Sequence, residues 1–262
     1  MIEFMKSIAK QAGAIALAGQ LELQKKRIHT KGNARDLVTD TDRAVEEFIC
    51  GRIREEYPQY GIFGEETGKS DSSSEYCFII DPIDGTASFV HNLPNWCVSI
   101  GLHKNGEPVA AVVYQPVMDD LYYAEKGKGA YLNGLRLHVS TCDTLVESIV
   151  GTGFFCLRAG WKEENNLKYI SRIAPLVCDL RKYGSAALDA CLVARGSLDA
   201  WWELCLAPYD IAAGVLILTE AGGKITDLHG GSEYPHKGIM GSNGAIHSTL
   251  LKFFEDHQDL HY

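Results

Sequence analysis

The chain has 262 residues, 46% of them hydrophobic, so it can bury a large core and is not expected to be disordered. Its 25 basic and 34 acidic residues give a formal net charge of −9, which disfavours nonspecific binding to nucleic acid or to an anionic membrane. An anionic ligand would therefore need a local source of positive charge, such as a bound cation.

The sequence begins with two predicted helices. Apolar residues recur at helical spacing over the first two dozen residues, which predicts an amphipathic helix. The polar stretch KGNARD at 31–36 predicts a loop. A second helix is expected to begin at Thr39, with Asp42 three positions later as in a capping box, and to end before Pro58. Asp42 is therefore expected in the first turn of that helix.

Strands are predicted next. Residues 61–64 form a short strand, 68–75 a polar loop and 76–81 a buried strand that ends on an acid. Three further segments are typical of a β-meander, namely CVSIGLH from 97, PVAAVVYQPV from 108 and DLYYAEKG from 120. Asn133-Gly134 is a favourable hairpin turn between two more extended segments.

From about residue 140 onward, strands and helices alternate. The predicted strands are SIVGTGF from 148, VCDLRKYG from 177, LDAWWE from 198 and KITD from 224. The predicted helices cover 163–174, 185–194, 208–221 and about 246–258. We therefore divide the chain into an N-terminal α+β half, residues 1–140, and a C-terminal α/β half, residues 141–262. No Pro/Gly/Ser-rich linker separates them, so we expect one compact unit.

Cysteine spacing and the N-terminal sequence bear on the compartment. The eight cysteines include no CxxC pair and no histidine at zinc-ligand spacing, so free thiols and no structural zinc site are expected. The start, MIEFMKSIAKQAG, lacks the charged and apolar blocks of a signal peptide, and no run of about 18 apolar residues occurs. These features predict a soluble cytoplasmic protein that does not enter a membrane.

Of four acidic motifs, DPIDGT at 81–86 is the most specific. Asp81 and Asp84 leave the end of a buried strand three residues apart, and Gly85-Thr86 would present backbone N–H groups at a turn or helix start. Mg²⁺ prefers oxygen ligands, and clustered N–H groups bind phosphate, so the motif indicates a metal-bridged phosphate site. Taken alone, the two aspartates could equally cap the turn.

Two other motifs are weaker and each contains a misleading likeness. GEE at 64–66 is interpreted either as a source of a metal ligand, Glu65, or as a solvated acidic loop. The overlapping sequence FGEETGKS is not a P-loop, because Phe63 stands where the first glycine of that motif is needed. VTDTD at 38–42 is similar to the start of an EF-hand loop, but Val45 and Gly51 stand where that loop needs glycine and glutamate.

The fourth motif is APYDIAAG at 207–214. Asp210 is expected in the first turn of an apolar helix, where, taken alone, it could simply complement the helix dipole. In this order and at these separations, LVTDTD, GEE, DPIDGT and PYDIAAG resemble the signature of the inositol monophosphatase family. The resemblance covers roughly residues 31–222, and the predicted terminal helices also fit the family.

The resemblance implies a fold and an activity. The fold is a layered αβαβα sandwich, mixing α+β and α/β features, as in the wider fructose-1,6-bisphosphatase superfamily. The activity is hydrolysis of a small phosphate monoester, such as a phosphorylated polyol or sugar. The family resemblance also implies dependence on Mg²⁺, sensitivity to lithium and a homodimer.

The resemblance further assigns roles to individual residues. Two metal ions, with a third and weaker ion near Glu65, would be held by Glu65, Asp81, the Ile83 carbonyl, Asp84 and Asp210. The attacking water would be positioned by Asp42 and Thr86 and polarised by Glu65. The phosphate and the substrate hydroxyl groups would be contacted by Lys31, Asp84, Gly85, Thr86, Ser185, Ala186 and Glu203.

One departure concerns the substrate. Pro208 and Tyr209 stand before Asp210 where inositol-specific members carry Cys-Trp. Inositol 1-phosphate is the first candidate, followed by fructose 1,6-bisphosphate, histidinol phosphate and 3′-phosphoadenosine 5′-phosphate.

Two other classes of protein are alternatives to this assignment. A haloacid-dehalogenase-type phosphatase is disfavoured, because the paired aspartates of that class lie two residues apart, whereas Asp81 and Asp84 lie three apart. A regulatory or RNA-processing partner on the same fold stays open, because such a role would leave no mark in the sequence.

Overall fold

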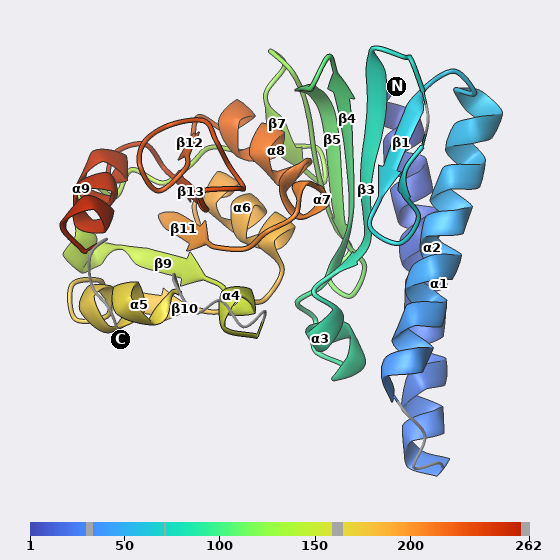
Figure 1. Ribbon diagram of the computed structural model, residues 1–262, viewed down its shortest axis with the longest axis horizontal. Helices are drawn as coiled ribbons and strands as arrows, with labels where there is room; N and C mark the ends of the chain where they lie inside the picture. The colour runs from blue at the N-terminus through green and yellow to red at the C-terminus, as the bar shows by residue number, and fades with distance from the viewer. Residues whose placement is uncertain (30–33, 71, 159–164, 258–262) are drawn as a thin grey trace.

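A computed structural model describes residues 1–29, 34–70, 72–158 and 165–257. Within these residues the chain forms five layers: a helix pair, an eight-stranded sheet, a helical layer, a five-stranded sheet and an outer helical layer (Figure 1). Three clusters of buried apolar side chains lie between the layers. The predicted αβαβα sandwich is therefore confirmed.

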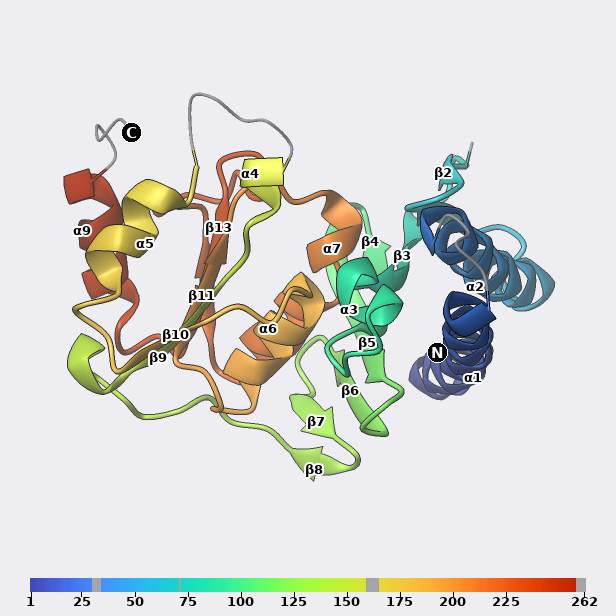
Figure 2. The same cartoon turned by 90° about the horizontal axis from the view of Figure 1, so that it is seen from below.

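The helix pair covers one face of the first sheet. α1 (Ile2–His29) and α2 (Ala34–Glu56) run side by side along it (Figures 1 and 2). Their buried side chains, including Ile8 and Ile49, pack against strand residues such as Phe78 and Ile100. Burial of this apolar stripe stabilises both helices, because isolated helices gain little from propensity alone.

The start of α2 differs from the prediction. The helix begins at Ala34, so Thr39 lies inside it and Asp42 is not in its first turn. The predicted capping box is therefore wrong, and the described part of the loop predicted at 31–36, residues 34–36, is helical. Ala34, Arg35 and Leu37 are favourable helix formers, and extending a helix that is already formed costs little.

The first sheet has the strand order β2-β1-β3-β4-β5-β6-β7-β8. β1 pairs parallel with β3, and the other neighbours pair antiparallel. The bounds are β1 (Gly61–Gly64), β2 (Gly68–Lys69), β3 (Tyr76–Asp84), β4 (Cys97–Lys104), β5 (Glu107–Gln115), β6 (Asp120–Glu125), β7 (Ala130–Leu132) and β8 (Leu135–Arg136). The predicted meander is confirmed, and Asn133 and Gly134 form the β7–β8 turn with positive φ angles.

Two features of this sheet were not predicted. β2 lies within the predicted loop at 68–75, because Gly68, at φ +72°, turns the chain back onto β1. β3 continues past residue 81 to Asp84, and its register with β4 shifts between Asp81 and Asp84. Pro82 cannot donate to the strand ladder, and such a bulge accommodates it at the point where the strand enters the DPIDGT turn.

The second sheet has the order β10-β9-β11-β13-β12. The bounds are β9 (Ile149–Thr152), β10 (Asp179–Arg181), β11 (Ala200–Glu203), β12 (Lys224–Thr226) and β13 (Ile239–Ser242). β13 was not predicted, although it pairs antiparallel with both β11 and β12. Its sequence, IMGS, is short and contains a glycine, so it shows neither alternation nor a long apolar run.

The remaining helices fill the middle and outer layers (Figure 2). The bounds are α3 (Thr86–Val90), η1 (Leu145–Glu147), α4 (Phe155–Arg158), α5 (Leu167–Ile173), α6 (Ala186–Ala194), α7 (Pro208–Ile211), α8 (Gly214–Glu220) and α9 (His247–His257). α6 begins as predicted, with the Ser185 side chain accepting a hydrogen bond from the Leu188 N–H. The predicted helix at 163–174 begins outside the described residues, at 163–164, and its described part is α5.

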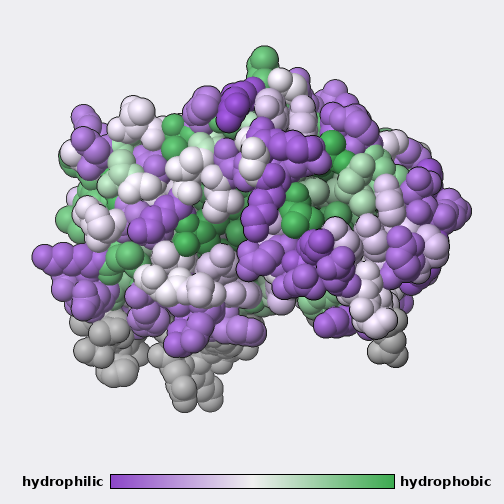
Figure 3. All heavy atoms as spheres, turned by 90° about the horizontal axis from the view of Figure 1, so that it is seen from above, coloured by the Kyte–Doolittle hydropathy of each residue, from purple (hydrophilic) through white to green (hydrophobic). Residues whose placement is uncertain are grey.

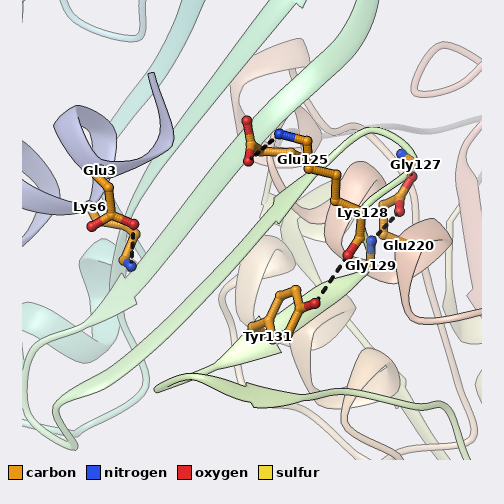
Figure 4. Close-up of polar contacts among 8 residues, drawn as sticks. All are labelled: Glu3, Lys6, Glu125, Gly127, Lys128, Gly129, Tyr131 and Glu220. Atoms are coloured by element: carbon orange, nitrogen blue, oxygen red, sulfur yellow. Dashed lines mark hydrogen bonds and ion pairs between the residues drawn. The ribbon is translucent and has the colours of Figure 1, made fainter.

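The predicted helix at 208–221 is divided into α7 and α8. The Ala212 carbonyl lies 3.2 Å from Nε2 of His103, outside the helical ladder. It also packs on Gly101, where an added Cβ would come within 3.0 Å of it. At its other end, α8 is tied to the β6–β7 turn, because Glu220 accepts hydrogen bonds from the N–H groups of Gly127 and Gly129, each at 2.7 Å (Figure 4).

The polar character of the surface agrees with the many charged residues in the sequence. The face seen in Figure 3 is mostly hydrophilic, and its hydrophobic residues form small separate groups. Among the helices in the described ranges, none has both the length and the apolar character that a membrane crossing requires.

Candidate active site

A cavity of about 260 Å³ opens between the two sheets. The end of β3 and the helix α7 meet there, in the middle of the molecule (Figures 1 and 2). The predicted residues that line it are Glu65, Asp81, Ile83, Asp84, Gly85, Thr86, Ala186, Glu203 and Asp210. Segments that are more than a hundred residues apart in the sequence thus contribute to one cavity.

The centre of the cavity is a group of three carboxylates. Asp81, Asp84 and Asp210 each offer an oxygen, and these oxygens all lie within 4.8 Å of one another. Asp81 and Asp84 are 2% and 8% exposed, so water screens them poorly. Buried like charges this close are unfavourable unless a cation joins them. An all-oxygen donor set of this kind fits Mg²⁺.

Short hydrogen bonds orient these carboxylates. Asp84 accepts from Ser185 Oγ at 2.6 Å and from the Ala187 N–H at 2.8 Å, which ties the end of β3 to the start of α6. Asp210 accepts from the Ala207 N–H at 2.6 Å at the start of α7. Such bonds fix the direction of each carboxylate before any ligand arrives.

The electrostatic state of the site follows from its burial. Burial, followed by neighbouring carboxylates, raises the pKa of Asp42 and Asp210 to about 8 and that of Glu65 to about 7. For Asp84, burial raises the pKa to only about 6, because the bonds from Ser185 and Ala187 favour its charged form. A nearby cation would favour the charged form of every one of these groups, so the cluster is suited to bind one.

Backbone N–H groups lie beside the carboxylates. Gly85 is the N-cap of α3 in the left-handed conformation, at φ +98°, and Gly85, Thr86 and Ala87 line the cavity. The first N–H groups of a helix have no partner within it and can bind an anion. The Thr86 hydroxyl donates to the Ile83 carbonyl at 3.3 Å, so two predicted site residues contact each other.

Two of the predicted residues that the structure describes do not line the cavity. Asp42 is buried on α2, 6% exposed, close enough to Glu65 for their charges to interact. Ser185 reaches the site only through its bond to Asp84. Lys31 lies outside the described residues.

Sequence reasoning missed other residues that line the cavity. Lys182 contributes a cationic side chain, and its charge lowers the pKa of Glu203, although burial and Asp84 raise that pKa to about 8 overall. Phe155, on α4, lines the cavity with its side chain largely exposed. Lys182 lies three residues before the predicted site residue Ser185, and this proximity was a signal for it. Nothing in the sequence around Phe155 pointed to the site.

Comparison with known proteins agrees with this geometry. The sequence profile described as the inositol monophosphatase family matches residues 1–259. An inositol-1-monophosphatase of Mesorhizobium japonicum is 37% identical over 254 residues, which cover 96% of this chain and 95% of that protein. The Nus factor SuhB of Pseudomonas aeruginosa is 36% identical over 262 residues, which cover 98% of this chain and 96% of that protein.

A solved structure shows the same fold. The inositol monophosphatase from Anabaena (Nostoc) superposes with a TM-score of 0.83 at 36% identity, covering 97% of this chain and 96% of that chain. Profile, sequence and structure each extend over nearly the whole length. The chain therefore belongs to the inositol monophosphatase family, a family of phosphoric monoester hydrolases.

Proposed function

We propose that this chain is a Mg²⁺-dependent phosphatase that hydrolyses a small phosphorylated polyol, with inositol 1-phosphate as the first candidate. The observation that carries the proposal is the group of Asp81, Asp84 and Asp210 oxygens within 4.8 Å of one another. The helix start at Gly85 lies beside that group in the same cavity. Carboxylates for a cation and N–H groups for a phosphate thus share one site.

The proposed metal ligands are Glu65, Asp81, the Ile83 carbonyl, Asp84 and Asp210. Bound Mg²⁺ supplies positive charge for the phosphate oxygens and lowers the pKa of a water molecule. In this proposal Asp42 and Thr86 orient the attacking water and Glu65 polarises it, and the N–H groups of Gly85 and Thr86 hold the phosphate. Phosphoryl transfer depends mainly on such in-line positioning and charge stabilisation.

Glu203 is proposed to recognise the substrate hydroxyl groups. Glu203, at the end of β11, lines the cavity and is 5% exposed. Trp201 Nε1 donates to its Oε1 at 3.2 Å, which holds the carboxylate in place. A buried carboxylate of this kind is a strong acceptor for hydroxyl groups.

We expect Glu203→Gln to lower kcat/KM for inositol 1-phosphate by about 10- to 100-fold, because a bound cation would favour the charged form of Glu203 and a hydrogen bond to a charged group contributes roughly 1.5–3 kcal/mol. Glutamine has the same shape and can still accept from Trp201, so the fold is retained. Para-nitrophenyl phosphate has no hydroxyl groups and serves as the matched substrate, for which kcat/KM should change less than about threefold. Equal losses on both substrates would show that Glu203 supports the site and selects nothing.

The proposal is tested by measuring phosphate release from a panel of monoesters, with and without Mg²⁺. The panel contains inositol 1-phosphate, fructose 1,6-bisphosphate, histidinol phosphate and 3′-phosphoadenosine 5′-phosphate. We expect the highest kcat/KM for inositol 1-phosphate. A different best substrate would change the substrate assignment and leave the reaction class in place, whereas no release from any of them would contradict the phosphatase proposal.

A second candidate role is that of a partner in RNA processing, supported by the relative named Nus factor SuhB. The net charge of −9 favours a protein partner over direct contact with nucleic acid. Complementation of a strain that lacks this gene separates the two roles. Rescue by the catalytically impaired Asp84→Asn variant would support a partner role, and failure to rescue would support a need for catalysis.

A further inference from the structure

Glu46 is a buried carboxylate of α2 that the proposed mechanism does not use. It is 0% exposed and does not line the cavity. Its Oε2 accepts from the Glu66 N–H at 3.0 Å, and its Oε1 accepts from the Thr67 N–H at 2.8 Å and the Thr67 hydroxyl at 2.6 Å. Both oxygens therefore hold the backbone that directly follows Glu65.

The residue before Glu65 is shaped by the same carboxylate. Gly64 ends β1, and a Cβ added there would meet Glu46 Oε1 at 2.2 Å and Oε2 at 2.7 Å. These separations are far below van der Waals contact, so glycine is needed at 64 for as long as the Glu46 carboxylate occupies this space. Glu46 thus packs against the chain on both sides of Glu65.

Glu46 also lies close to Asp42. The two residues are four positions apart in α2 and so share one face of the helix. The second link between this helix and the loop is the pair Arg43–Glu66, whose N and O atoms are 3.7 Å apart, with the Arg43 side chain 64% exposed. An exposed ion pair of that length contributes little. The buried bonds of Glu46 therefore dominate this connection.

From this geometry we propose that Glu46 is a positioning residue that fixes the Glu65 carboxylate relative to Asp42. Asp42 belongs to α2, and Glu65 belongs to the loop after β1. Glu46 joins these two elements through three hydrogen bonds. The inference rests on the proposed function, in which both residues act on the same water and Glu65 also holds a metal ion. Displacement of a reacting group by about 1 Å can cost a hundredfold in rate.

The test compares Glu46→Gln with Glu47→Gln, a matched change at the neighbouring exposed position. Glutamine keeps the volume but replaces one of the two accepting oxygens with an NH₂ group, which cannot accept from the Glu66 N–H, so that bond to the loop is lost. We expect Glu46→Gln to lower kcat at least about tenfold, to leave KM for the substrate within about threefold, and to raise the Mg²⁺ concentration for half-maximal binding at least about fivefold by titration calorimetry. Glu47→Gln should change none of these.

Hydrogen exchange supplies a readout that needs no activity. The amide of Glu66 should exchange at least about tenfold faster in Glu46→Gln than in wild type, because its acceptor is lost, whereas the amide of Thr67 can keep the glutamine oxygen. An inactive wild type would sink the proposed function. An active wild type with unchanged kcat, Mg²⁺ affinity and amide exchange in Glu46→Gln would overturn the inference alone. A lower kcat with unchanged exchange of the Glu66 amide would also overturn it, because the loop after Glu65 would then be held without Glu46.

A double substitution tests the contact with Gly64. Gly64→Ala should lower kcat at least about tenfold in the wild-type background, where the added methyl group meets the Glu46 carboxylate. In the Glu46→Ala background, which provides the space, the same substitution should change kcat less than about twofold. Equal effects in both backgrounds would contradict the proposed contact.

Discussion

We expect Asp84→Asn to lower kcat at least about a hundredfold while leaving the fold intact. The substitution removes one negative charge from a proposed metal ligand in a cavity where charge stabilisation dominates. The asparagine carbonyl oxygen can still accept from Ser185 Oγ and the Ala187 N–H, so the junction between β3 and α6 is kept. The melting temperature in the absence of metal should not fall, because burial already disfavours the charged form and raises the pKa of Asp84 to about 6.

Steady-state kinetics, circular dichroism and thermal unfolding measure these effects. Asp227→Asn is the matched control, because Asp227 is a buried carboxylate that accepts from the N–H groups of His229 and Gly231 at 2.8 Å and does not line the cavity. The control should lower stability and change kcat less than about threefold. If Asp84→Asn behaves in the same way as the control, Asp84 is only a turn cap.

The second large effect is expected at Gly85. A Cβ added there would lie 2.6 Å from the Asn95 carbonyl oxygen, and the backbone is left-handed at φ +98°. Alanine must therefore move the turn, and with it the N–H groups of Thr86 and Ala87 that are proposed to hold the phosphate. We expect kcat/KM for inositol 1-phosphate to fall at least about a hundredfold, because small displacements of positioning groups are costly.

Gly106→Ala separates conformational strain from displacement of the site. Gly106 also has a positive φ, of +84°, but no atom lies within 4 Å of an added Cβ, and the residue belongs to the β4–β5 turn. The control should lose about 1 kcal/mol of stability with kcat/KM within twofold of wild type. A comparable loss of activity in both variants would contradict a role for the Gly85 turn in binding phosphate.

The parts of the site that the sequence predicted are local. Asp81, Asp84 and Gly85 lie within one short motif, and the strand that precedes it and the turn that follows it fix their relative positions whatever the rest of the chain does. Asp210 could be joined to them only through the family resemblance, because its approach to Asp84 depends on the packing of α7 against β3.

The parts that the sequence did not predict depend on contacts between distant segments. Glu46 resembles any acid on an exposed helix until α2 is packed against a loop that begins 20 residues later. The break between α7 and α8 involves His103, which is 109 residues from Ala212. The start of α2 differs from the prediction for the opposite reason: Thr39 has the local pattern of a helix cap, but the favourable helix formers before it continue the helix to Ala34.

The central claim is that a cation held by these carboxylates is required for hydrolysis, and the most direct test is the initial rate of phosphate release from inositol 1-phosphate as free Mg²⁺ is varied. We predict no measurable rate in excess chelator, full recovery when Mg²⁺ is restored, and inhibition by millimolar Li⁺, which can enter a Mg²⁺ site with half the charge. The purified protein should unfold at a higher temperature with Mg²⁺ than with chelator, because binding to the folded state stabilises it. A full rate of phosphate release in excess chelator would contradict the account.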